Sequence, residues 1–129
     1  MRVLLDTHTF LWFIEDHPRL SRVARQLIED NTTVPFLSVA SLWEMAIKIS
    51  LGKMTVGNQS FETFIPEQMS RNDIAPLDIT VWHVARVAVL PLAHRDPFDR
   101  MLIAQAIIEE LPIISADSIL DAYPVTRIW

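Results

Sequence analysis

The chain has 129 residues, of which 50% are hydrophobic and 21% are charged. This length is typical of one domain, and the apolar content excludes a disordered chain. No uninterrupted apolar run approaches the ~18 residues of a membrane span, and the apolar run that ends at the first acid, Asp6, has only three residues, too few for a signal peptide. We therefore expect one cytoplasmic domain over residues 1–129 that does not contact a membrane.

Three further counts exclude classes of function. The absence of cysteine excludes thiol nucleophiles, disulfides and thiolate-bound zinc. The two glycines, Gly52 and Gly57, are too few for a glycine-rich phosphate loop, and neither belongs to a G-x-S-x-G nucleophile motif. The net charge of −5 disfavours binding of nucleic acid through bulk charge alone. It does not exclude a nuclease whose acidic residues bind cations.

The first half of the chain alternates short apolar runs with amphipathic segments. In chain order we predict a strand at 3–5, helices at Thr9–Glu15 and Arg19–Asp30, a strand at 34–37, and a helix at Ser41–Leu51 that Gly52 ends. The second helix has apolar residues at i, i+3, i+4, i+7 and i+8, from Leu20 to Ile28. This spacing predicts one apolar face.

The second half repeats the alternation. Residues 60–71 are helical in pattern, but Pro66 predicts a break or two short helices there. The remaining predictions are an edge strand at 74–77, a helix at Thr80–Leu90, a helix opened by Asp96, a strand at 112–115, a helical turn at Ser118–Ala122 and a strand at Val125–Trp129. Repeated strand and helix alternation predicts an α/β fold with a parallel sheet and helices on both faces.

Four carboxylates fall at the ends of strands or the starts of helices. Asp6 directly follows the first strand, Asp117 lies two residues beyond Ser115 at the end of another, and Glu44 and Asp99 lie in the first turns of predicted helices. Strand ends and the helix starts that follow them share one edge of a parallel sheet, where ligands bind. Asp6, Glu44 and Asp117 are therefore expected to converge, and Asp99 joins them if the segment before its helix ends at the same edge.

Clustered carboxylates repel one another and raise each other's pKa values unless a cation lies among them. Oxygen ligands without thiolate or a histidine pair favour Mg²⁺ or Mn²⁺. Such an ion polarises a phosphoryl oxygen and activates water. The sequence thus predicts a divalent metal site on Asp6, Glu44, Asp99 and Asp117.

Each acid also has a structural interpretation. Ser41 and Glu44 match the S-x-x-E capping box, and Asp96 is a candidate N-cap with a proline after it and Asp99 at the third helical position. Asp117 is a candidate turn residue or cap of a short helix. Asp6 is harder to explain structurally, because an ionisable group beside a buried strand is costly unless paired or solvated.

The histidines and aromatic residues carry weaker signals. His8 is two residues from Asp6, which allows a role near the site, whereas His94 and the other histidines have no zinc-like spacing and are not predicted as ligands. Trp12 and the other large aromatics fall at helical spacings beside apolar residues, so core packing is the default expectation. An excess of them is also compatible with a dimer interface.

Four blocks of sequence together resemble PIN-domain proteins, and within them the VapC-type toxins of toxin-antitoxin pairs. The blocks occur in the same order along the whole chain, and the third is the most specific. They are Leu4-Leu5-Asp6-Thr7-His8, Ser41 to Lys48, His94-Arg95-Asp96-Pro97-Phe98-Asp99-Arg100-Met101-Leu102-Ile103-Ala104-Gln105-Ala106, and Ser115-Ala116-Asp117.

The resemblance implies a PIN-like three-layer α/β sandwich around a five-stranded parallel sheet, and an Mg²⁺- or Mn²⁺-dependent endoribonuclease. By motif position the metal-binding acids are Asp6, Glu44, Asp99 and Asp117, with Ser115 supplying a hydroxyl two residues before the last acid. It further implies an RNA substrate, a homodimer and a cognate antitoxin protein. The chain departs from the family pattern at His8, where many members have asparagine.

Two other functions remain open at this level. An aspartyl phosphatase also has an aspartate after its first strand, but it needs a second acid two residues later, where this chain has His8. A non-catalytic interaction domain with a PIN-like fold would be marked by loss of the acids, and all four are present.

Overall fold

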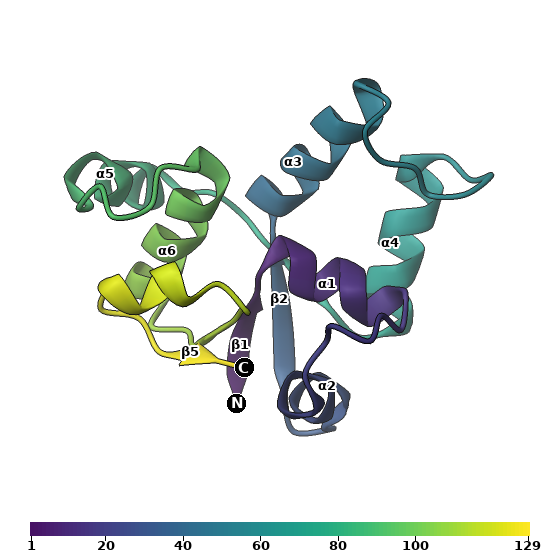
Figure 1. The fold of residues 1–129 in the computed structure, drawn as a ribbon, viewed down its shortest axis with the longest axis horizontal. Helices are drawn as coiled ribbons and strands as arrows, with labels where there is room; N and C mark the ends of the chain where they lie inside the picture. The colour runs from purple at the N-terminus through teal and green to yellow at the C-terminus, as the bar shows by residue number, and fades with distance from the viewer.

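The computed structural model describes residues 1–129. Five parallel strands form one sheet in the order β3-β2-β1-β4-β5, with the first strand at its centre (Figure 1). The strands are β1 (Arg2–Leu5), β2 (Val34–Ser38), β3 (Ala75–Leu77), β4 (Ile113–Ile114) and β5 (Arg127–Ile128). Strand β3, which contains Pro76, lies at an edge of the sheet as predicted, where a missing N–H is tolerated.

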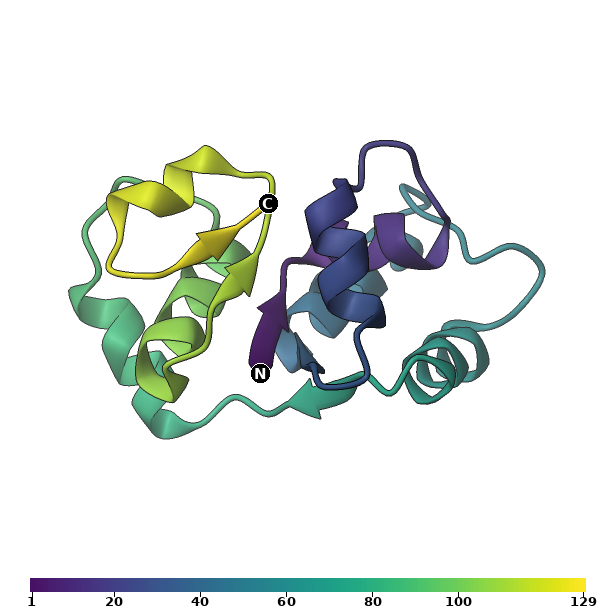
Figure 2. The ribbon, with the colours of Figure 1, turned by 90° about the horizontal axis from the view of Figure 1, so that it is seen from below.

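Helices cover both faces of the sheet, which makes a three-layer α/β sandwich and confirms the predicted fold class. They are α1 (Thr7–Ile14), α2 (Arg22–Glu29), α3 (Val39–Ser50), α4 (Phe61–Arg71), α5 (Val81–Val89), α6 (Pro97–Glu109) and the 3₁₀ helix η1 (Ser118–Ala122). Figures 1 and 2 show α5 and α6 grouped on one side of the central strand and α1, α2 and α4 on the other.

Alternate residues of β1 enter two separate hydrophobic cores. Val3 and Leu5 pack with residues of α1, α2 and α4, whereas Leu4 packs with residues of α6 and η1. All three side chains are fully buried. A strand covered on both faces needs apolar residues at every position, which explains the uninterrupted run after Arg2.

Helices α1 and α2 do not begin where the sequence predicts. Helix α1 begins at Thr7, so Asp6 is its N-cap residue. Helix α2 begins at Arg22 rather than Arg19, because the Ser21 hydroxyl accepts the N–H of Ala24 and caps the helix there. Val23 is 51% exposed, so the apolar face of α2 is narrower than predicted.

The predicted break at Pro66 is wrong. Helix α4 runs unbroken from Phe61 to Arg71 with Pro66 inside it. Proline removes one backbone N–H from a helix interior, but Ile65 and Met69 on either side of it are buried in the core. Tertiary packing therefore outweighs the local propensity.

The predicted end of α3 is confirmed. Gly52 has φ of +71°, and its N–H binds the carbonyl of Ile49, while the N–H of Lys53 binds the carbonyl of Lys48. This pair of bonds is the Schellman arrangement, in which glycine accepts the left-handed conformation without strain. None of the helices is long and apolar enough to cross a bilayer.

Candidate functional site

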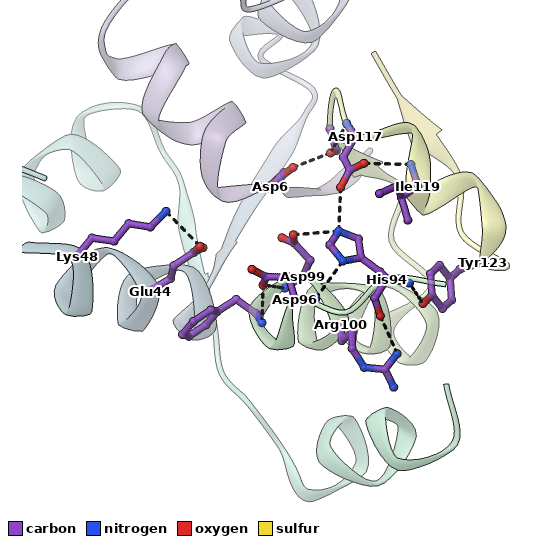
Figure 3. Close-up of polar contacts among 12 residues, drawn as sticks. Asp6, Glu44, Lys48, His94, Asp96, Asp99, Arg100, Asp117, Ile119 and Tyr123 are labelled. Carbon is purple, nitrogen blue, oxygen red and sulfur yellow. Dashed lines mark hydrogen bonds and ion pairs between the residues drawn. The ribbon is translucent and has the colours of Figure 1, made fainter. Parts of the chain in front are cut away.

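Three of the four predicted acids line one cavity at the carboxyl edge of the sheet. Asp6 follows β1, Asp117 follows β4, and Asp99 lies in the first turn of α6. The cavity measures about 440 Å³, and its other lining residues are His8, Trp12, Arg19 and Ala116. Figure 3 shows Asp6, Asp99 and Asp117 converging from three different elements.

Asp6 is held by a hydroxyl group and not by a helix cap. Although it is the N-cap residue of α1, its side chain makes no capping bond. Its Oδ2 accepts a hydrogen bond of 2.6 Å from the Ser115 hydroxyl of β4's extension. Burial raises the pKa of Asp6, and the bond from Ser115 offsets part of that effect. The carboxylate is thus oriented toward the cavity at some cost in solvation.

Asp99 is the centre of the charge cluster. Asp96 is the N-cap of α6, as predicted, and its Oδ1 accepts the N–H groups of Phe98 and Asp99. The carboxylate of Asp99 has no capping role. Burial raises its pKa to about 7, and the negative charges of Asp6, Asp96 and Glu44 act in the same direction against the opposing effect of His94.

Glu44 approaches Asp99 from the other side, and the capping-box interpretation of it is wrong. The N-cap of α3 is Ser38, whose hydroxyl accepts the N–H of Ala40. Ser41 lies inside the helix and accepts a hydrogen bond from Thr7. Glu44 is therefore one turn further into α3 than predicted.

The Glu44 carboxylate has one paired and one unpaired oxygen. Oε2 lies 3.4 Å from the ammonium group of Lys48, and Oε1 is buried without a hydrogen-bond partner. It does not line the cavity of Asp6, Asp99 and Asp117, and its effect on Asp99 is through charge. Figure 3 shows it across Asp99 from Asp117.

Asp117 combines a structural role with a place in the cluster. Its Oδ1 caps the short helix η1 by accepting the N–H of Ile119, which confirms the predicted cap. Its Oδ2 lies 2.9 Å from Nε2 of His94, and the same nitrogen lies 3.1 Å from Oδ2 of Asp99. His94, Asp99 and Asp117 each place one ligand atom within 4.8 Å of the others.

The tautomer of His94 follows from its second nitrogen. Nδ1 accepts the backbone N–H of Asp96, so the ring proton of the neutral imidazole is on Nε2. Nε2 therefore donates toward Asp99 and Asp117 together. Sequence analysis assigned His94 no role because its partners lie 23 positions away or on a helix whose orientation the sequence does not give. His94 lies in the segment that leads to the N-cap Asp96, and this segment must bring the chain back to the carboxyl edge of the sheet. That position is the signal in the sequence that could have identified His94.

The segment that carries His94 is held by two buried groups. The guanidinium of Arg100 donates to four backbone carbonyls, and the hydroxyl of Tyr123 donates to Pro91 and accepts the N–H of His94. The four carbonyls are those of Val87, Leu90, Pro91 and His94. Arg100 is therefore a structural residue that holds the segment carrying His94.

The residues present fit a divalent cation. Asp6, Asp99 and Asp117 offer oxygen atoms around one cavity, the pKa of Asp99 is raised by burial and by neighbouring negative charge, and a buried oxygen of Glu44 has no partner. Hard cations such as Mg²⁺ and Mn²⁺ bind oxygen donors of this kind and relieve such repulsion. The arrangement is suited to placing positive charge beside a bound phosphate.

Comparison with known proteins identifies relatives in sequence. The family model described as PIN domain matches residues 3–125. The chain is also 33% identical over 91 residues to Ribonuclease VapC16 of Mycobacterium tuberculosis, a match that covers 61% of this chain and 64% of that protein. The similarity thus spans a little under two thirds of the curated relative's length.

Comparison with solved structures identifies the fold. VapBC2 from Rickettsia felis, bound to a DNA fragment from their promoter, gives a TM-score of 0.75 at 14% identity, with 99% of this chain and 98% of that chain covered. A toxin-antitoxin complex from Klebsiella pneumoniae gives 0.66 at 16% identity, with coverage of 98% and 96%. At these identities the similarity establishes a shared fold.

Proposed function

The chain belongs to the PIN domain family, as its sequence motifs indicated, and from this membership we propose that it is a metal-dependent endoribonuclease that acts as the toxin of a toxin-antitoxin pair. The observation that carries the proposal is the convergence of Asp6, Asp99 and Asp117 on one cavity, with the pKa of Asp99 raised by burial and by its charged neighbours. The relative at 33% identity is named as a ribonuclease.

In this proposal Asp6, Asp99 and Asp117 hold Mg²⁺ or Mn²⁺, and Glu44 supplies further negative charge or a ligand oxygen. The bound ion polarises a phosphodiester oxygen and lowers the pKa of an attacking water. Ser115 orients Asp6 through its 2.6 Å hydrogen bond, and His94 orients Asp99 and Asp117 through Nε2. The protein's part is to fix these donors before RNA arrives.

The proposed partners are RNA, an antitoxin protein and a second copy of the chain. Structural neighbours of this fold include toxin-antitoxin complexes. Exposed apolar side chains on α5 and just after it form a surface that can pack against another protein. They are Val81, Trp82, Val84, Val89 and Leu92, each at least half exposed.

The test of the proposal is cleavage of a mixed RNA pool with Mn²⁺, with Mg²⁺ and with EDTA. Asp6→Asn removes one charge and keeps an oxygen that accepts from Ser115, so the fold should persist while cleavage falls at least about 100-fold. Asp73→Asn makes the same change at an exposed residue before β3, at the opposite edge of the sheet, and should cut at the wild-type rate.

Two results would contradict the proposal. Cleavage by Asp6→Asn at the wild-type rate would show that the assigned site is wrong. Calorimetric binding of Mn²⁺ by a wild-type protein that cuts no RNA in the pool would favour the non-catalytic interaction domain.

A further inference from the structure

Part of the lining of the cavity has a different chemistry from the three acids. It is formed by His8 and Trp12 of α1 and by Arg19 of the segment between α1 and α2. None of these residues belongs to the set of acids described above. Two aromatic rings and one cation therefore face the same space as three carboxylates.

Four aromatic rings lie close together around Trp12, and His8 and Trp12 among them line the cavity. The rings of Trp12 and His17 are stacked, with centroids 5.7 Å apart and an interplanar angle of 23°. The centroid of the His8 ring lies 5.8 Å from that of Trp12, and His8 is an exposed residue that lines the cavity. Trp129 lies 5.9 Å from Trp12, and both tryptophans pack against the core. Packing on several sides holds the Trp12 ring in one orientation.

Arg19 supplies an uncommitted positive charge. Its backbone N–H donates a hydrogen bond to Nδ1 of His17, which fixes the Arg19 backbone beside the ring that stacks on Trp12. Its guanidinium is exposed and takes part in none of the ion pairs or side-chain hydrogen bonds of the chain. It is the only lysine or arginine that lines this cavity.

We propose that His8, Trp12 and Arg19 form a subsite for one unpaired nucleotide of single-stranded RNA next to the scissile phosphate. The base packs against the His8 and Trp12 rings, and Arg19 binds the adjoining phosphate. This inference rests on the proposed function, since it assigns the substrate's neighbouring nucleotide to the same cavity.

The chemistry of a nucleotide matches this part of the lining in two ways. A base has a neutral aromatic face, so it stacks on protein rings beside carboxylates that would repel a second phosphate. A guanidinium binds phosphate oxygens through paired N–H groups, and an unpaired one loses no ion pair when RNA binds. A base-paired nucleotide has its faces covered by its neighbours in the helix, so the subsite selects unpaired strands.

The experiment measures binding of a fluorescein-labelled, 20-nucleotide RNA of mixed sequence without secondary structure, in Mn²⁺, with Asp6→Asn present throughout to stop cleavage. In that background Trp12→Leu and His8→Ala should each weaken binding by about 5- to 150-fold, the range for loss of one base stacked on an aromatic ring. Trp12→Phe keeps an aromatic face and should retain most of the affinity.

Arg19→Ala is tested through the salt dependence of binding. Loss of one phosphate contact should reduce the slope of log K against log salt concentration by about 0.7 for a single strand. The matched control is Arg22→Ala, which removes the same charge from an exposed position outside the cavity and should leave the slope unchanged.

A scan with abasic nucleotides separates stacking from damage to the fold. Removing the base at the subsite position should weaken binding to the parent protein but not to Trp12→Leu, because the two changes remove the same contact and are not additive. His8→Ala, at an exposed residue, provides a second variant that should not disturb the core.

The inference and the proposed function can fail separately. The subsite would be overturned if the Asp6→Asn parent and its Trp12→Leu and His8→Ala variants bound the RNA with equal affinity. It would also be overturned if the losses from Trp12→Leu and from base removal were additive at every abasic position. Either result would hold even if the wild-type protein cuts RNA. Absence of cleavage by the wild type, together with the predicted losses of binding, would overturn the nuclease and leave the nucleotide subsite in place.

Discussion

Two buried histidines in this protein each lie 2.9 Å from a carboxylate, yet they belong to different kinds of region. His83 pairs with Glu109 where α5 packs on α6, and His94 pairs with Asp117 at the cavity edge. Both rings are at least nine-tenths buried. Distance and burial therefore do not distinguish a structural pair from a candidate site.

In the His83 region both ring nitrogens of the histidine have a partner. Nδ1 accepts the N–H of Thr80 in a reciprocal capping box, so Nε2 carries the proton that Glu109 accepts. Gln105 binds the carbonyl of Asp78 nearby.

The His94 region has more carboxylates than donors. One N–H faces both Asp99 and Asp117, further negative charge comes from Asp6 and Glu44, and the pKa of Asp99 rises to about 7. Such a surplus is destabilising without a cation. The comparison teaches that unbalanced charge around a cavity, more than a short contact, marks the region available for chemistry.

The largest effect should come from removing the structural histidine. His83→Ala leaves a void and an unpaired Thr80 N–H, so the free energy of unfolding should fall by about 3 kcal/mol. Urea denaturation measures this change. Mn²⁺ affinity of the folded protein should stay the same, and a loss of affinity would show that the two regions are coupled.

Removing the other histidine should affect metal binding. His94→Ala takes away the donor that orients Asp99 and Asp117, and loss of such a supporting group weakens metal binding about 10- to 100-fold. Calorimetry with Mn²⁺ provides the measurement. His94→Gln retains an N–H donor and should recover part of the Mn²⁺ affinity. The positioning role would be contradicted if His94→Ala bound Mn²⁺ as tightly as the wild type, or if His94→Gln recovered none of the lost affinity.

The sequence predicts the strands well and the ends of helices less well, for physical reasons. A strand buried on both faces needs an unbroken apolar run, so Val3 to Leu5 is visible locally. Ser38 and Ser41 are equally good caps by sequence. Only the contact of Ser41 with Thr7, 34 positions away, commits Ser41 to another role.

In the candidate site, too, the sequence predicts some residues and misses those whose role depends on distant contacts. Asp6 and Asp117 could be placed from strand ends, because topology alone brings those points to one edge, whereas Asp99 was expected there only if the segment before its helix ended at that edge. His94 could not be placed in this way, since its partner Asp117 is distant in sequence. Glu44 was predicted in the first turn of its helix, and the unpredicted cap at Ser38 moves it to the next turn.

Burial and the surrounding carboxylates should also make the stability of the protein depend on pH. The pKa of Asp99 is raised from 3.8 to about 7, so between these values the folded protein binds a proton that the unfolded chain releases. The resulting stabilisation is fully present below pH 3.8 and is lost as pH rises through about 7. Metal-free protein in EDTA should therefore lose stability across this window, and the raised pKa of Asp6 acts in the same direction.

Asp99→Asn is the variant that isolates this term. Asp30 and Asp121, whose pKa values are lowered, make stability rise with pH, but they are present in both proteins. The difference in thermal midpoint between Asp99→Asn and wild type should therefore grow from pH 4 to pH 7, with the variant more stable at pH 7. Saturating Mn²⁺ should stabilise the wild type more than the variant, because the ion replaces the proton in relieving the repulsion. Parallel pH profiles for the two metal-free proteins would mean that Asp99 is not the group that carries the surplus charge, and the contrast with the His83 region would then lose its electrostatic basis.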